Sequence, residues 1–518
     1  MAGTGGSQAV LVARVRRLAN PEYDASVQAL LTTARAPASE PSFPPDLRQD
    51  GFTVNDAQRI DAVIIEQLAD AAEALASEAQ ANGTLARLAP CADGAERTAC
   101  AQAFITTFGA QVYRRPLVDE EVNALLGLYA IGADDATFED GIAHVTRGLL
   151  QSAGFLYLTE FGDAARGKGH IDLTPHELAS SLSYLLTSAP PDAALLAKAT
   201  AGSLSDPSER EAQARRLFAS DPRAQNTVVR LVREWLGTDR IGESTKDSLV
   251  YPEFAGLKAQ MVSESSDFVR AVAFESTGNV AELFGADWTV NSGPLSLYRT
   301  AGDGPVAGST RITDRVGILN QAAFLATYAN AHESHPIFRG VALARRVACL
   351  PLDSPASFDL TVVPPVPDKA QTTRERFSVH PADSICAGCH DIIDPFGFAF
   401  EHFDGMGAYR AQENGKDVDS SVVVNIEAEY DGTLADYDGS YADSNALATA
   451  LSESTVVREC MARFMFRAAA ATGDSAATPG EAEFIDFWRS LPAAAQGNLV
   501  ETLIAYVKSP GFALREAL

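Results

Sequence analysis

Residues 384–410 read SICAGCHDIIDPFGFAFEHFDGMGAYR, and the cysteine pair in this stretch decides the fold of its part of the chain. Cys386 and Cys389 lie three residues apart, and His390 follows directly. On one helical turn, two such thiols can each add to a vinyl group of a haem while the adjacent imidazole binds the iron. With six cysteines and eight histidines among 518 residues, this pattern seldom arises by chance. The motif therefore predicts one covalently attached haem c, with His390 as an axial ligand of the iron.

Three other interpretations of the CAGCH motif stay open. A zinc site needs four ligands, and the chain has no second C-x-x-C and no H-x₃-H. A thioredoxin-like redox pair needs a strand-to-helix setting, whereas a proline-rich segment, SPASFDLTVVPPVPDK, precedes this motif. The last interpretation is a disulfide between Cys386 and Cys389 themselves.

Helical patterns dominate the rest of the chain. LTPHE (173–177) predicts a helix start at which Thr174 is the cap and Glu177 completes a capping box. Gly237, after the helical REWL, predicts a helix end. The sequence therefore predicts a mainly α protein of several helical segments, one of which is a cytochrome c-like haem-binding segment.

Two local features refine this fold class. Strand-like alternation is convincing only near 413–445, around SSVVVNIEAEYDG, which predicts a small β-containing insertion there. Asp394-Pro395 predicts the end of the motif helix, because proline disrupts helical hydrogen bonding.

Breaks in the helical pattern divide the chain into five predicted segments. They are an N-terminal helical segment (1–83), a helical segment with an RRPL motif (84–165), a third helical segment (166–300), the CxxCH segment (301–412), and a small strand region followed by C-terminal helices (413–518).

The charge of the chain excludes some partners. With 41 basic and 68 acidic residues, the net charge is −27. Such a surface repels phosphate backbones and anionic lipid, which argues against binding to nucleic acid or to a membrane surface. No apolar run approaches the roughly 20 residues of a membrane span. The N-terminal MAGTGGSQAVL has two interpretations: a lipoprotein tether from which the export signal and acylated cysteine are gone, or an ordinary N-terminus.

The other four cysteines form an even set. Cys91 and Cys100 bracket a short polar loop that a local disulfide could close, and Cys349 and Cys460 would then form a long-range bridge. Disulfides belong to oxidising compartments. The alternative is four free, buried cysteines in a cytosolic protein.

A series of motifs also runs along the whole chain: RRLANPEYDASVQALL (16–31), VYRRPLVDEEV (112–122), LLQSAGFLYLTE (149–160), REWLG (233–237), RVGILNQAAFL (315–325), HPIFRG (335–340) and CAGCHDIIDPFGFAFEHFDGMGAYR (386–410). In this order they resemble the exported planctomycete-type cytochrome c-like multidomain family, which is built from consecutive uncharacterised domains. The resemblance implies a mostly helical protein located in the periplasm, at the cell surface or outside the cell. It also implies that Arg114 and Arg115 form structural ion pairs.

The second axial ligand would decide what the haem does. A methionine raises the potential and suits an electron carrier, whereas an open position could activate peroxide. The candidates are Met406, His335, His332, Met461 and Met465. A Cys349–Cys460 bridge would carry the last two toward the motif. In the resembled family, a small or aliphatic residue stands where Met406 is and a serine usually stands where His335 is.

These features favour an exported monohaem c-type cytochrome that passes electrons to a redox partner protein. A haem-dependent oxidoreductase of the peroxidase or oxygenase type is the alternative enzyme, and a surface-anchored binding or scaffold protein with a structural haem is the third hypothesis. Arg410 could pair with a carboxylate or with a haem propionate. Three aspartates in 434–444 imperfectly resemble a calcium loop, with a solvated turn as the alternative.

Overall fold

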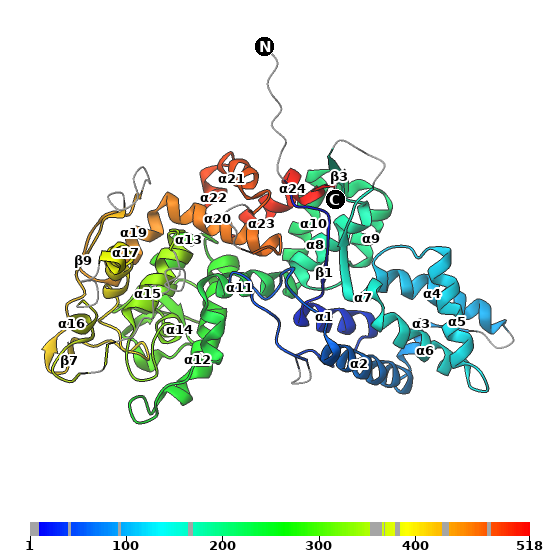
Figure 1. Cartoon of the computed structure of the whole chain (residues 1–518), viewed down its shortest axis with the longest axis horizontal. Coiled ribbons are helices and arrows are strands. Elements are labelled where there is room, and N and C mark those ends of the chain that lie inside the picture. Colours follow the sequence, from blue (N-terminus) through cyan, green and yellow to red (C-terminus); the bar gives the residue numbers. More distant parts are fainter. Residues whose placement is uncertain are drawn as a thin grey trace, which may run out of the picture. The chain divides into compact units, whose positions relative to one another are not determined.

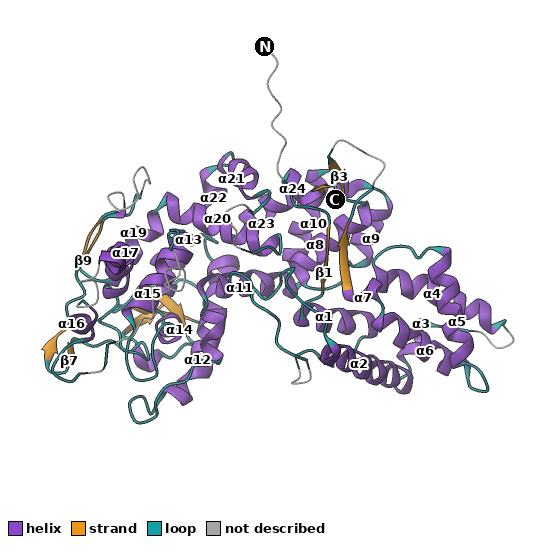
Figure 2. Cartoon of the chain, viewed as in Figure 1, coloured by secondary structure: helices purple, strands orange, loops and turns teal. Residues whose placement is uncertain are grey.

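The computed structural model describes residues 10–39, 43–91, 95–163, 169–352, 365–366, 368–378, 384–426, 435–473 and 478–517, with backbone alone at 384–386. Helices make up most of the described chain and the sheets are small (Figure 1 and Figure 2), so the predicted mainly α fold is confirmed. The chain forms two compact units. Unit 1 comprises Met1–Thr227, Arg467–Phe484 and Ile504–Leu518, and unit 2 comprises Val228–Phe466 and Ile485–Leu503.

Unit 1 is built mainly from helices of the N-terminal half. They are α1 (Asn20–Leu31), α2 (Ala62–Ala81), α3 (Thr84–Leu88), α4 (Arg97–Tyr113), α5 (Asp119–Gly132), α6 (Phe138–Gln151), α7 (Ala153–Leu156), α8 (Pro175–Thr187), α9 (Ala193–Thr200), the 3₁₀ turn η2 (Ser203–Ser205), α10 (Pro207–Ser220) and α24 (Pro510–Ala513). The division between the units falls within α11 (Pro222–Leu236), α20 (Thr455–Ala469), α21 (Glu481–Arg489) and α23 (Leu499–Lys508).

Capping explains where several of these helices begin and end. The Thr174 hydroxyl accepts from the backbone N–H of Glu177, and the Glu177 carboxylate accepts from the N–H of Thr174, as the capping box predicts. Helix α11 ends at Leu236, and Gly237 follows with φ +73°, a left-handed conformation that suits glycine. Both predictions from the sequence are confirmed.

The core of unit 1 lies among α2, α4, α5 and α6, whose apolar residues form one buried cluster. Helices α5 and α6 approach closely because α6 presents glycine at the contact: an added Cβ at Gly141 would meet the ring of Tyr129. In the RRPL motif, Arg115 forms the expected ion pair with Glu121 (2.7 Å). Arg114 donates to the backbone carbonyls of residues 154, 155 and 157.

Two small antiparallel sheets of unit 1 lie outside the predicted strand region. Strand β1 (Arg14–Arg17) pairs with β2 (Tyr157–Glu160), and β3 (His170–Asp172) pairs with β11 (Leu514–Glu516). The register places Arg14 opposite Glu160. Each strand has only three or four residues, so no alternating pattern is long enough to stand out in the sequence.

Unit 2 contains shorter helices and more irregular chain. Its helices are η3 (Thr238–Gly242), α12 (Phe254–Arg270), η4 (Ala271–Glu275), α13 (Val280–Gly285), η5 (Leu295–Leu297), η6 (Ile318–Asn320), α14 (Ala322–Thr327), α15 (Pro336–Ala342), η7 (Leu343–Val347), α16 (Thr373–Phe377), α17 (Ser384–Phe398), α19 (Ser444–Glu453) and α22 (Ala493–Gln496).

The predicted β-containing insertion is present in unit 2. Strand β9 (Val422–Val424) pairs with β10 (Gly439–Tyr441), and β7 (Gln412–Glu413) pairs with β8 (Lys416–Asp417). A three-stranded sheet of order β4 (Trp288–Val290), β6 (Ser309–Ile312), β5 (Thr300–Asp303) was not predicted. Short strands therefore also occur outside 413–445, the region where the sequence shows convincing alternation.

Both predicted disulfides are present. Cys91 bonds Cys100 within unit 1, and Cys349 bonds Cys460 within unit 2. They mark the protein as extracytoplasmic, because such bridges persist in oxidising compartments. Among the helices of the described ranges, none combines the length and the apolar character that crossing a membrane requires.

Candidate functional site

The CAGCH motif occupies the first two turns of α17 in unit 2. Cys386 and Cys389 are three residues apart on this helix, close to one turn of 3.6 residues. Cys389 is a half-buried free thiol, whereas the Cys386 side chain lies outside the described residues. An added Cβ at Gly388, between the two cysteines, would meet no atom of the described residues within 4 Å.

His390 is held by a carboxylate from the same helix. Its Nδ1 lies 2.8 Å from Oδ1 of Asp394, and both side chains are largely buried. A carboxylate can only accept, so Nδ1 carries the proton and the lone pair of the neutral ring lies on Nε2. This is the tautomer in which a histidine binds a metal through Nε2 while its other nitrogen donates to a carboxylate. The donor set of the motif therefore fits an axial histidine.

Asp394 was missed as a functional residue and assigned instead, with Pro395, to the end of the helix. Helix α17 continues through Pro395 to Phe398, so that prediction is wrong. Pro395 lies in the last turn and has no N–H to donate to the carbonyl of Asp391, so the helix continues there with one hydrogen bond fewer. The signal that could have found Asp394 is its spacing: residues four apart on a helix face each other.

Helix α15 fixes the second half of α17. An added Cβ at Gly340 of α15 would collide with the carbonyl of Ile393, and one at Gly397 of α17 would collide with the carbonyl of Pro336. The two backbones are therefore in direct contact at glycine. Because the earlier residue of α15 meets the later residue of α17, the helices run in opposite directions. This contact anchors α17 immediately after the motif.

The chain that follows α17 is held by buried arginines. Arg339 of α15 donates to the backbone carbonyls of residues 400, 403 and 404, and Arg315 donates to that of Gly407. Both arginines are almost completely buried. Burial lowers the pKa of Arg339 to about 10, which leaves the guanidinium charged at neutral pH. The loop 399–410 is thus fixed by charged donors to its backbone.

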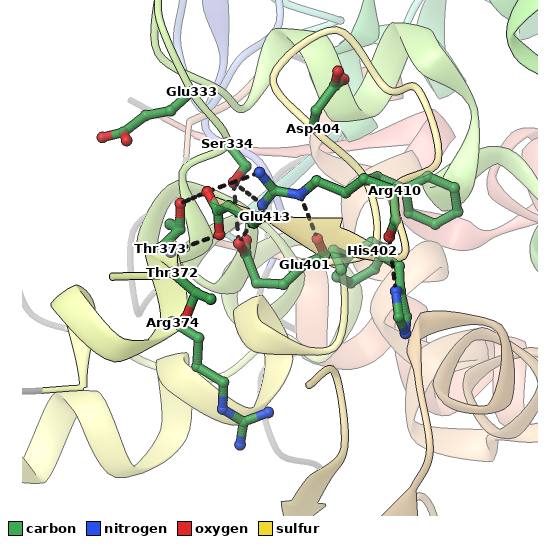
Figure 3. Close-up of polar contacts among 12 residues, drawn as sticks. Glu333, Ser334, Thr372, Thr373, Arg374, Glu401, His402, Asp404, Arg410 and Glu413 are labelled. Carbon is green, nitrogen blue, oxygen red and sulfur yellow. Dashed lines mark hydrogen bonds and ion pairs between the residues drawn. The ribbon is translucent and has the colours of Figure 1, made fainter. Parts of the chain in front are cut away.

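Arg410 pairs with carboxylates (Figure 3). Its guanidinium lies 2.8 Å from Oε2 of Glu401 and 2.9 Å from Oε1 of Glu413, and it also donates to the hydroxyl of Ser334. Glu413 in turn accepts from the backbone and hydroxyl of Thr373 at the start of α16. Of the two partners expected for Arg410, a carboxylate is what the structure shows. Binding of a haem propionate by Arg410 stays a prediction.

Glu401 is the most deeply buried acid of this network. Burial raises its pKa, and the ion pairs with Arg410 and Arg339 offset only part of that effect. Its Oε2 is hydrogen bonded, while Oε1 has no hydrogen-bond partner among the described residues and lies 4.0 Å from a nitrogen of Arg339. Sequence reasoning missed Glu401, because nothing local marks a glutamate that pairs across a loop.

The histidines predicted as second axial ligands have other roles in the described structure. His335 is buried and caps α15, its Nδ1 accepting from the backbone of Phe338, on whose ring it stacks. Burial, together with the nearby Arg339, lowers the pKa of His335 to about 4. His332 is 60% exposed and lies 3.1 Å from Asp247.

The methionine candidates are all buried. Met406 belongs to an apolar cluster with Tyr251, Phe254 and Met261, and none of the described members of this cluster lies on α17. Met461 and Met465 lie on α20, beside the bridged Cys460. The identity of a second axial ligand stays a prediction.

The aspartates near 434–444 bind protein groups. Asp436 accepts from the backbone and hydroxyl of Thr455, and Asp443 caps α19. Residue 434 lies outside the described residues. Within the described ranges, no group of three or more His, Cys, Asp or Glu side chains is arranged to hold a metal ion.

Four family models match the chain in succession. They are PSD3, a protein of unknown function (DUF1587), at 16–81; PSD5 (DUF1595) at 100–160; PSD4 (DUF1592) at 173–298; and PSCyt3 (DUF1588) at 315–413. No curated protein and no solved structure matched the chain. The CAGCH motif and the arginine-held loop both fall within the PSCyt3 match. The chain is therefore similar, in consecutive segments and in this order, to the planctomycete-type domains PSD3, PSD5, PSD4 and PSCyt3.

Proposed function

We propose that the protein is an exported c-type cytochrome that transfers electrons outside the cytoplasm. Cys386 and Cys389 would hold the haem covalently, and His390 would bind its iron. A bound haem supplies one-electron chemistry between ferric and ferrous iron. The observation that carries the proposal is the Nδ1 contact of His390 with Asp394, because it selects the tautomer that a metal-binding histidine needs.

Two further observations support this function. The other four cysteines are consumed in two disulfides, so the motif cysteines are left for another use. The compartment that keeps those disulfides is also the one in which a covalently held haem is useful, since a lost cofactor is hard to replace there. The name of the PSCyt3 match also points to a cytochrome-like domain.

Covalent haem content tests the proposal. The chain is exported in a host with c-type haem maturation, denatured, and tested for haem that stays with the polypeptide after acid–acetone extraction. We expect one haem per chain, and none in the variant Cys386→Ala/Cys389→Ala. A variant without the unit 1 disulfide, Cys91→Ser/Cys100→Ser, is the control and should keep its haem. A colourless wild-type chain from this host would disprove the proposal.

A second candidate function is a haem-dependent oxidoreductase of the peroxidase or oxygenase type. It is favoured by the buried carboxylate on His390, because such a partner raises the basicity of the ligand. The ferric spectrum separates the two functions. Six-coordinate, low-spin iron that does not react with peroxide supports the electron carrier, whereas high-spin iron that reacts with peroxide supports the enzyme. A bound haem that neither accepts electrons nor reacts with peroxide would leave the hypothesis of a binding or scaffold protein with a structural haem.

A further inference from the structure

The hydrogen bond between His390 and Asp394 lies within one helix and is largely shielded from water. The two residues are four apart on α17, about one turn of the helix, and their side chains are only 14% and 12% exposed. The nitrogen and oxygen are 2.8 Å apart, in the range of a charge-assisted hydrogen bond. Water cannot readily replace the carboxylate at such a site, so the bond should persist.

A second acidic residue on the same helix shows that position, and not charge alone, makes this contact. Asp391 is directly next to His390 in the sequence, yet it is exposed. Neighbouring residues on a helix point about 100° apart and do not face each other. The helix therefore presents one carboxylate to the imidazole and another to solvent, each carrying the same formal charge.

We propose that Asp394 is a positioning residue that lowers the reduction potential of the haem iron bound by His390. This inference rests on the proposed haem function and adds the direction in which the protein shifts the reduction potential. A carboxylate that accepts the Nδ1 proton makes the imidazole a more basic, more electron-rich ligand. Such a ligand stabilises ferric iron more than ferrous iron. The same bond fixes the rotation of the ring about its axis, and with it the side from which Nε2 approaches the metal.

The surrounding structure keeps Asp394 in place. The next turn of α17 is wedged against α15 through Gly397 and Pro336, and the preceding turn contacts it through Ile393 and Gly340. Asp394 lies between these two contacts, so the backbone that carries its carboxylate cannot shift without separating the helices. An isosteric substitution can therefore change the charge of the side chain while the helix stays where it is.

The midpoint potential of the haem-loaded full-length chain tests the inference. Asp394→Asn keeps the shape of the side chain but removes its charge, and Asp391→Asn removes the same charge from the exposed neighbour. We expect Asp394→Asn to shift the ferric-to-ferrous equilibrium toward ferrous iron by about tenfold, or about 59 mV, and Asp391→Asn to shift it much less. Asp394→Glu keeps the negative charge, so its midpoint potential should lie closer to that of the wild type than the potential of Asp394→Asn does. Equal shifts in the two Asn variants would overturn the inference.

A second measurement needs no haem. In full-length chain with ¹⁵N-labelled histidine, made without haem attachment, the signals of eight imidazoles report their tautomers. We expect the signal that disappears in His390→Asn to show a protonated Nδ1, and to change in Asp394→Asn but not in Asp391→Asn. An Nε2-protonated ring in the wild type would overturn the positioning role. A wild type that shows protonated Nδ1 but never takes up haem would instead refute the proposed function.

Discussion

Two buried glutamates, one in each unit, lie in opposite electrostatic surroundings. In unit 1, Oε2 of Glu160 lies 2.8 Å from Arg14 and 2.7 Å from Arg515. In unit 2, Glu264 accepts hydrogen bonds of 2.6 Å from the neutral hydroxyls of Thr289 and Tyr298, and Arg315 contributes only a coulombic attraction. The first acid closes an ion-pair cluster between strands, whereas the second is a buried carboxyl held by hydroxyls.

The pKa values of the two acids move in opposite directions. Burial alone would raise the pKa of Glu160, but the two arginines outweigh it and hold the pKa well below its usual range. For Glu264, burial dominates and raises the pKa to about 7, against the lowering effects of the two hydroxyls and of Arg315. Two glutamates that both lie largely out of water thus differ in charge near pH 6, where Glu160 is ionised and Glu264 is mostly protonated, and the chemical type of the partner decides which state results.

The units also differ in the size of the loop that each disulfide closes. The bridged residues are 9 apart in unit 1 and 111 apart in unit 2. Closing a longer loop removes more entropy from the unfolded chain. Loss of Cys349–Cys460 should therefore lower the free energy of unfolding of unit 2 by about 5 kcal/mol, the largest of the effects expected here. Loss of Cys91–Cys100 should cost unit 1 about 3 kcal/mol.

Chemical denaturation of the two double Cys→Ser variants checks this difference, with fluorescence or hydrogen exchange to separate the units. Reduced wild-type protein, in which both bridges are open, is the control. If removing the short-loop bridge destabilised its unit as much as removing the long-loop bridge does, the entropic explanation would be wrong.

Glu160→Gln should destabilise unit 1 by about 4 kcal/mol at pH 7, because it leaves two buried arginines without their partner. The folded-state pKa of Glu160 is depressed, so its contribution is present above the unfolded-state pKa of about 4.5 and is lost as the pH falls below that value. The difference between wild type and variant should accordingly shrink on acidification. A difference that grows toward acid would contradict the ion-pair assignment.

Glu264→Gln should change the free energy of unfolding in the opposite direction from Glu160→Gln. The folded-state pKa of Glu264 is raised, so the wild type loses stability as the pH rises from about 4.5 to about 7 and carries the full penalty above that range. The variant should therefore be more stable than wild type at pH 8, by up to about 3 kcal/mol, and similar to it at pH 4.5. Hydroxyls can both donate and accept, so Thr289 and Tyr298 can accommodate the amide. Urea denaturation at the two pH values measures the difference in free energy of unfolding between variant and wild type. The same difference at pH 4.5 and pH 8 would refute the raised pKa of Glu264.

The smallest expected effect compares two helix caps of the same chemistry. Thr174 caps α8 of unit 1 and Thr372 caps the short α16 of unit 2, each in a capping box with a glutamate. Either Thr→Ala substitution should cost about 1 kcal/mol. The two Thr→Ser variants, which keep the hydroxyl, are the controls and should lose much less. Thermal unfolding of the four variants checks this, and a loss equal in the Ala and Ser variants would show that the hydroxyl is not the cause.

The sequence predicts those features whose signal is local. The cap at Thr174, the stop at Gly237 and the helical character of the chain depend on residues within a few positions of each other. The disulfides followed from counting cysteines once the motif pair was set aside. The three-stranded sheet and the site of Glu264 could not be predicted, because their partners come from separate segments: Glu264 is on α12, whereas Thr289 and Tyr298 lie further along. Asp394 was misjudged because its neighbour Pro395 carries a stronger local signal.

The Cys349–Cys460 bridge has a consequence for the integrity of the chain. It closes a covalent ring that contains the whole of α17 and the loop 399–410. A protease that cuts this ring once leaves both fragments joined through the sulfurs, so the piece that carries CAGCH cannot diffuse away. In an extracytoplasmic compartment, where damaged protein is not resynthesised in place, the chain would keep its motif segment through one cut and release it only after reduction or a second cut.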